Sequence, residues 1–210
     1  MTFNVTSVSA GGIGEIIVSF DVREGEKRSV SRFLISDDAY TKLSLTVGMS
    51  DMLTYEAVER EAYIYGAYKR AIYLLGFSAS SRRALYKKLV SKGFDPEYSR
   101  IALDRLSDNG LLCEADSAIR EAEKCASKLW GEERIRAALF EKGYSDESIL
   151  AAFFALEDSG VDFDENCLSL IKKKYSSLPT DKKELQKIIS SLMRYGYSLS
   201  QIKRAIALGR

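Results

Sequence analysis

Hydrophobic and polar residues alternate with a period of two along the first part of the chain, and two glycine-containing turns interrupt the pattern. Phe3 and Val5 start the alternation, it continues through residues 16–22, and the apolar-rich segment 30–35 after the second turn resembles a third strand. Side chains that alternate in this way lie on opposite faces of a β-strand, so that one face can be buried. We therefore predict an N-terminal region of three strands, followed by a short helix that ends near residue 43.

Beyond residue 50 the period changes to that of a helix. Tyr55, Val58, Ala62 and Tyr65 recur at spacings of three and four, and similar patterns continue to the C-terminus. Such spacing places an apolar stripe along one side of a helix. The tyrosines of this first helix alternate with basic residues, a pattern that also occurs where aromatic rings stack on unpaired bases. We interpret these tyrosines as packing the helix onto the strands, and base stacking is the alternative.

The helical part of the chain contains three copies of one pattern, each centred on a glycine. Gly93, Gly143 and Gly196 lie 50 and 53 residues apart. In every copy a leucine precedes the glycine by four residues and an aromatic residue follows it directly. An apolar residue also precedes the glycine by eight positions, and an alanine follows it by nine. The recurring residues are Leu85, Leu89, Phe94 and Ala102 in the first copy, Ile135, Leu139, Tyr144 and Ala152 in the second, and Ile188, Leu192, Tyr197 and Ala205 in the third.

Each recurring position has a physical role in a helical unit. The glycine suits the left-handed conformation that ends many helices. The next aromatic residue can cover the junction, and Asp95, Ser145 or Ser198 can cap the following helix. We predict a mainly α fold in which three tandem three-helix repeats form an elongated, curved array after a short N-terminal β region. The predicted segments are 1–50 for the β region with its short helix, and 51–110, 111–160 and 161–210 for the repeats.

The composition excludes several classes of catalytic site. The 210 residues include no histidine, so the chain cannot form a Ser-His-Asp or Cys-His relay or a histidine-rich zinc site. The three cysteines include no CxxC pair, which argues against a zinc site or a disulfide framework. The glycines at 11–14 lack the order of a dinucleotide-binding or phosphate-binding loop. We therefore expect a protein that is not an enzyme and that needs no cofactor or metal.

Hydropathy and charge also bound the location of the protein and its partners. No apolar run approaches the roughly 18 residues that a membrane span requires. The N-terminus lacks the basic and apolar segments of a secretory signal. The net charge of the whole chain is +1, so no strong overall field attracts a polyanion. We expect a cytoplasmic monomer without a membrane partner.

Three segments in the same order resemble the RecX family. Residues 81–89 resemble the family's Ser-x-x-Glu-Leu-x-x-Lys-Leu segment, with Ala84 in place of the glutamate. Residues 110–116 resemble its Gly-[Tyr/Leu]-[Leu/Ile]-Asp-Asp stretch, although a cysteine interrupts the acidic pair. Residues 131–143 resemble its Gly-x-x-[Arg/Lys]-Ile-x-x-x-Leu-x-x-Lys-Gly segment. The resemblance covers about residues 70–210.

This resemblance implies a regulator of the RecA recombinase that binds the RecA nucleoprotein filament. Members of the family lie along the helical groove of the filament and modulate its ATPase, strand-exchange and coprotease activities, and we expect inhibition. A curved array of helical repeats suits such a groove. The alternative is an autonomous DNA-binding protein whose three-helix units work as helix-turn-helix modules on single- or double-stranded DNA.

Basic residues gather in the last 40 positions, where ten lysines and arginines face only Asp181 and Glu184. A charge run is often only a solvated face, and the functional alternative is contact with DNA phosphate or an acidic surface of RecA. Arg83 and Lys87 lie opposite an apolar stripe, so they face water and extend the candidate surface. Trp130 is interpreted either as a packing residue or as an exposed interface anchor. The candidate contact residues are Arg82, Arg83, Lys87, Lys172, Lys173, Lys174, Lys182, Lys183, Lys187, Arg194, Lys203 and Arg204.

Overall fold

The structure is a computed structural model that describes residues 1–175, 178–179 and 181–208. Contacts between residues divide the chain into two compact units. The N-terminal unit comprises Met1–Ser78 and Leu85–Leu112, and the C-terminal unit comprises Ala79–Ala84 and Cys113–Arg210. Arg210, one of the basic residues counted in the sequence, lies outside the described residues.

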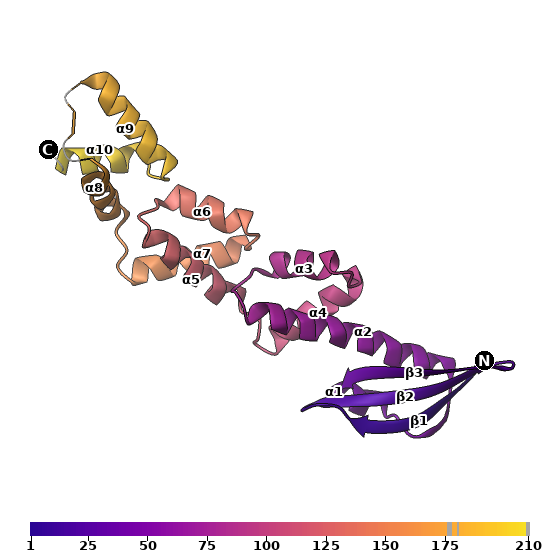
Figure 1. Cartoon of the computed structure of the whole chain (residues 1–210). Coiled ribbons are helices and arrows are strands. Elements are labelled where there is room, and N and C mark those ends of the chain that lie inside the picture. Colours follow the sequence, from indigo (N-terminus) through magenta and orange to yellow (C-terminus); the bar gives the residue numbers. More distant parts are fainter. Residues whose placement is uncertain (176–177, 180, 209–210) are drawn as a thin grey trace. The chain divides into compact units, whose positions relative to one another are not determined.

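The N-terminal unit begins with an antiparallel sheet in the order β3-β2-β1-β4, and Figure 1 labels its three long strands β1, β2 and β3. Its strands are β1 (Thr2–Ala10), β2 (Glu15–Glu24), β3 (Lys27–Ser36) and β4 (Gly48–Ser50). The three predicted strands are confirmed. The sequence did not predict β4, because its three residues are too few for a period of two to be recognised. The predicted short helix is α1 (Asp37–Leu43), and Ser36 caps it by accepting a hydrogen bond from the N–H of Ala39.

One face of this sheet packs against α2 (Met52–Leu75). The ring of Tyr55 contacts Phe3, Phe20 and Phe33, with centroid distances of 4.8, 5.1 and 5.4 Å. Tyr55 therefore packs the helix onto the strands, as the sequence predicted. Tyr73, from the same helix, is instead 54% exposed, so packing explains only part of the tyrosine-rich pattern.

The predicted repeats follow along the chain. The first repeat consists of α2, α3 (Arg82–Ser91) and α4 (Pro96–Asp108). The second consists of α5 (Glu114–Ala126), α6 (Glu132–Glu141) and α7 (Asp146–Asp158). The third consists of α8 (Phe163–Lys174), α9 (Lys182–Arg194) and α10 (Leu199–Leu208). After α3, α6 and α9, the three repeat glycines have φ angles of +88°, +81° and +92°, the left-handed region predicted for them. Asp95, Ser145 and Ser198 each accept a hydrogen bond from a backbone N–H in the first turn of the next helix, as predicted.

The recurring apolar positions form the cores of the repeats. Leu85, Leu89 and Ala102 are buried in the first repeat, Ile135, Leu139 and Ala152 in the second, and Ile188, Leu192 and Ala205 in the third. The mainly α fold with its N-terminal sheet and three-helix repeats is therefore the one predicted. The elongated, curved arrangement and the segment boundaries stay predictions. No helix within the described ranges is long and apolar enough to cross a membrane.

Candidate binding surface

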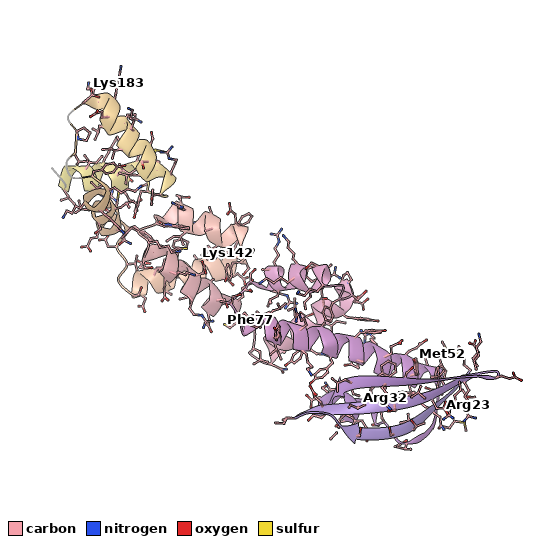
Figure 2. All side chains as sticks on the ribbon, in the orientation of Figure 1. Arg23, Arg32, Met52, Phe77, Lys142 and Lys183 are labelled. Atoms are coloured by element: carbon pink, nitrogen blue, oxygen red, sulfur yellow. The ribbon has the colours of Figure 1, made fainter. Side chains whose placement is uncertain are left out.

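Three of the predicted contact residues form a basic stripe along α9, which we call the α9 stripe. Lys183, Lys187 and Arg194 are spaced by four and seven residues, which places them on one face of the helix. All three are exposed, and none has a hydrogen-bond or ion-pair partner among the residues that the structure describes. Buried Ile188 and Leu192 anchor the helix. The stripe extends about 16 Å along α9, and Figure 2 shows Lys183 near its N-terminal end.

A second basic group, Lys172, Lys173 and Lys174, occupies the last turn of α8, and all three are exposed. The partial negative charge of a helix C-terminus favours cations there. The Nζ of Lys174 lies 4.0 Å from the centroid of the Tyr195 ring. Lys174 lowers the pKa of Tyr195, first because it donates a hydrogen bond to the phenol oxygen and second because the lysine is positively charged. This contact ties the end of α8 to the residue that follows α9.

Replacing Lys174 by methionine is expected to raise the pKa of Tyr195. A nearby cation favours the phenolate, so its removal shifts tyrosinate formation to higher pH. Ultraviolet titration of each protein, compared with its Tyr195→Phe counterpart, isolates this tyrosine. Lys172→Met, in the same turn of α8, is the matched control and should leave the titration unchanged. Identical titrations for Lys174→Met and the wild type would contradict the assignment.

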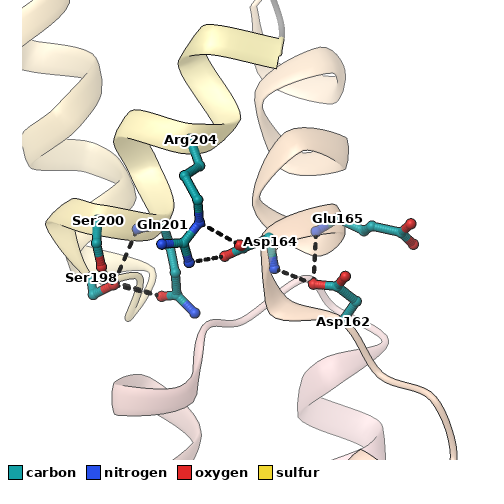
Figure 3. A network of polar contacts seen from close by, with 7 residues as sticks. All are labelled: Asp162, Asp164, Glu165, Ser198, Ser200, Gln201 and Arg204. Atoms are coloured by element: carbon teal, nitrogen blue, oxygen red, sulfur yellow. Dashed lines mark hydrogen bonds and ion pairs between the residues drawn. The ribbon is translucent and has the colours of Figure 1, made fainter.

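Arg204 of α10 makes a bidentate ion pair with Asp164 of α8. Its Nε and Nη2 lie 2.6 and 2.9 Å from the two carboxylate oxygens (Figure 3). Asp162 caps α8 by accepting a hydrogen bond from the N–H of Asp164, which fixes the start of that helix. The pair therefore joins two helices of the third repeat. The neighbouring Lys203 is exposed and has no partner among the described residues.

The remaining basic candidates are Lys182, at the start of α9, and three residues of α3 in the first repeat: Arg82, Arg83 and Lys87. Arg83 and Lys87 are exposed, as the sequence predicted. The aliphatic part of Arg83 packs over Gly143. The backbone N–H of Arg82 donates to the Oε1 of Glu114 at 3.0 Å. The candidates therefore fall on two repeats, and the α9 stripe is the longest run of exposed cations without a described partner.

A cluster of rings and cations that the sequence did not predict lies where the second and third repeats meet. The guanidinium of Arg134 lies 3.9 Å from the centroid of the Trp130 ring and 5.1 Å from that of Tyr195. Trp130 is partly buried against the core of the second repeat. Trp130 is therefore a packing residue rather than an exposed interface anchor. Together with Lys174, these side chains form a continuous series of cation–π contacts from the third repeat to the second.

Two glycines bring the backbones of the same repeats into contact at a site that we call the glycine joint. The N–H of Gly131 donates to the carbonyl of Tyr195 at 2.7 Å, and the N–H of Glu133 donates to the carbonyl of Gly196 at 3.2 Å. A Cβ on Gly131 would lie only 2.4 Å from the carbonyl carbon and oxygen of Gly196. The N-terminus of α6 therefore packs directly on the glycine turn of the third repeat, and a side chain at either glycine would prevent this approach.

Ser81 occupies the equivalent position at the start of α3. It lies 12 residues before Gly93, as Gly131 lies 12 residues before Gly143. Its hydroxyl donates to the carbonyl of Lys142 at 2.6 Å and accepts a hydrogen bond from the N–H of Ala84 at 3.1 Å. Ser81 therefore caps α3 and also contacts the glycine turn of the second repeat. The shared spacing of 12 residues was the signal in the sequence that could have identified these contacts.

Within the described ranges, no three histidine, cysteine, aspartate or glutamate side chains lie close enough together to hold a metal ion. Burial raises the pKa of Cys167 to about 11, so the reactive thiolate is disfavoured at neutral pH. Exposed cations, in contrast, lie in positions where a large partner can reach them.

Two parts of the chain match domains of a known protein family. Residues 67–106 match the first three-helix domain of RecX, and residues 162–206 match its third three-helix domain. The second match includes the whole α9 stripe. The chain is also similar to the regulatory protein RecX of Xanthomonas axonopodis pv. citri (strain 306), with 33% identity over 138 residues that cover 65% of this chain and 83% of that protein. It is similar as well to the regulatory protein RecX of Pseudomonas fluorescens, with 31% identity over 140 residues that cover 66% of this chain and 88% of that protein.

Solved structures share the fold. The crystal structure of a regulatory protein RecX has a TM-score of 0.74 at 20% identity and covers 96% of this chain and 98% of that one. The structure of RecX from Lactobacillus salivarius has a TM-score of 0.61 at 23% identity and covers 70% of this chain and 96% of that one. With the fold shared, both terminal domains matched and relatives covered over most of their length, the chain belongs to the RecX family of regulatory proteins.

Proposed function

We propose that this protein regulates the RecA recombinase by binding the RecA nucleoprotein filament, and that it acts by binding rather than by catalysis. The observation that carries the proposal is the match to relatives named regulatory protein RecX, of which the chain covers more than four fifths. RecA as the partner follows from the family resemblance. Inhibition of the ATPase, strand-exchange and coprotease activities is the proposed direction of regulation.

The basic residues supply the proposed contact. The α9 stripe is exposed on an anchored helix and has no partner in the part of the chain that the structure describes, so it can meet acidic side chains of RecA or phosphates of the DNA in the filament. The predicted segments 51–110, 111–160 and 161–210 would each form one repeat of the protein. The protein would act in the cytoplasm as a monomer, without a cofactor.

The test is a titration of RecA ATP hydrolysis on single-stranded DNA with the purified protein. We expect the ATPase rate to fall when there is less than one molecule of this protein for each RecA protomer. Strand exchange, measured in parallel, should fall over the same range. If neither activity changes at any excess of the protein, the proposal is wrong.

The α9 stripe also favours a second candidate function, which is autonomous binding of DNA. Lysines and arginines along an exposed helix can neutralise phosphates without RecA. The discriminating measurement is the affinity for bare DNA as a function of salt concentration. Tight, strongly salt-dependent binding with an unchanged RecA ATPase would establish this second function. The net charge of +1 favours the first, because autonomous DNA-binding domains are usually strongly basic.

A further inference from the structure

The second repeat has an unusually apolar surface on α6 and α7. Phe140, Leu150 and Phe154 are 61%, 52% and 62% exposed. Phe140 and Leu150 line an open groove of about 530 Å³ between the two helices, together with Ala137. Phe154 lies one helical turn after Leu150, so the apolar surface continues along α7. We call these four residues the α6–α7 face. Contiguous apolar surface of this kind marks interaction sites more often than scattered single residues do.

The other two repeats provide an internal control for this face. Leu150 and Phe154 lie seven and eleven residues after the repeat glycine. The same positions carry Arg100 and Asp104 in the first repeat and Lys203 and Ala207 in the third, and all of these are exposed. The three-helix unit therefore folds without large apolar side chains at these positions. Position −3 from the glycine is less informative, because Val90, Phe140 and Met193 are all apolar there.

The charges beside the α6–α7 face show which kind of partner fits it. Glu133 and Asp146 line the groove, and Glu157 and Asp158 lie beside Phe154, all of them exposed. The one basic residue that lines the groove, Arg136, donates a hydrogen bond to Glu132 at 3.1 Å and stacks on Phe153 at 4.5 Å. An acidic rim repels phosphates, so nucleic acid does not fit. A protein surface with apolar side chains surrounded by lysines or arginines does.

We propose that the α6–α7 face docks a protein surface of this chemistry. The partner is a RecA protomer of the filament, and this identity rests on the proposed function. It assigns protein contact to the second repeat and leaves contact with phosphates to the basic third repeat. Phe140 and Phe154 would be the anchors, because large aromatic side chains contribute most of the energy at such interfaces.

The test exchanges residues between repeats. The double variant Leu150→Arg/Phe154→Asp gives the second repeat the residues that the first repeat carries at these positions, so the fold and the melting temperature should be retained. We expect its affinity for RecA filaments, measured by fluorescence anisotropy, to fall at least about tenfold. Its affinity for bare single-stranded DNA should not change. Met52→Asp/Leu53→Arg, which replaces two exposed apolar residues of the N-terminal unit, is the matched control and should bind filaments normally.

Three outcomes would overturn the inference in distinguishable ways. If the wild type binds filaments and the double variant binds them equally well, this inference fails while the proposed function stands. If the wild type neither binds filaments nor alters the ATPase, the proposed function fails, and RecA as the partner of this face fails with it. If sedimentation shows a dimeric wild type and a monomeric double variant, the face belongs to a second copy of this chain instead.

Discussion

Replacing Gly131 by alanine is expected to destabilise the glycine joint and to lower the melting temperature by about 10 °C. Gly131 has an ordinary φ of −79°, so backbone strain does not contribute. The cost comes from the new Cβ, which would lie 2.4 Å from the backbone of Gly196. Because backbone atoms cannot rotate away as a side chain can, the two repeats must separate, at about 3 kcal/mol of unfolding free energy.

The molecule contains its own probe for this change. Trp130 is the chain's one tryptophan, it directly precedes Gly131, and its ring lies 3.9 Å from the guanidinium of Arg134. If the joint opens, the tryptophan emission spectrum shifts. Gly66→Ala is the matched control: a Cβ there would meet only the ring edge of Phe94 at an ordinary 3.7 Å. Gly66 lies inside α2, so alanine should stabilise the protein by about 1 kcal/mol. Equal melting temperatures for Gly131→Ala and the wild type would show that the close approach is absent in solution.

The repeats were predictable because their signals are local. Each repeat is marked within a short stretch of sequence. The stretch contains a glycine after an apolar helical stripe, an aromatic residue directly after the glycine and a capping side chain two residues after the glycine. All three repeat glycines adopt the expected left-handed conformation. The N-terminal strands were predictable for the same reason, since alternation is visible within a single strand. The three-residue β4 was missed because it is shorter than the pattern that identifies a strand.

The contacts of the candidate surface were not predictable from local patterns. Gly131 contacts Gly196, which lies 65 positions away in the sequence, and Arg204 pairs with Asp164, which lies 40 positions away. Charge counting placed Arg204 in the same class as Lys183, although Arg204 is held in an ion pair and Lys183 makes none with the residues that the structure describes. Which cations stay unpaired depends on which helices are neighbours in the fold, and the periodicity of one helix does not contain that information.

The second and third repeats belong to one compact unit but differ in surface chemistry. The α6–α7 face is apolar with an acidic rim, and the α9 stripe is basic. The glycine joint and the series from Trp130 to Lys174 hold these repeats together. A partner that offers both protein and phosphate can engage both surfaces at once, and two linked contacts bind more tightly than either alone. A nucleoprotein filament is such a partner. Gly131→Ala should therefore weaken filament binding as well as stability.

Reversing the charge of the α9 stripe is expected to have the largest effect on regulation. The variant is Lys183→Glu/Lys187→Glu/Arg194→Glu. Each lost contact with an acidic group or phosphate is worth about 1 kcal/mol at close range in water. Three lost contacts would therefore weaken filament binding about 100-fold. The fold should be retained, because the three side chains are exposed and have no partner among the described residues. The measurement is the concentration of protein that halves RecA ATPase activity.

The matched control is Lys42→Glu/Lys92→Glu/Lys124→Glu. These three lysines are also exposed, and their reversal changes the net charge by the same amount, from +1 to −5. If the loss came from net charge alone, both variants would inhibit RecA equally poorly. If the α9 stripe makes the contact, the control should keep nearly all of its activity. The salt dependence then identifies the partner group, because contacts with DNA phosphates release counterions and give a steep dependence on salt concentration. A stripe that contacts acidic side chains of RecA gives a shallower one, since protein carboxylates carry no condensed counterion layer.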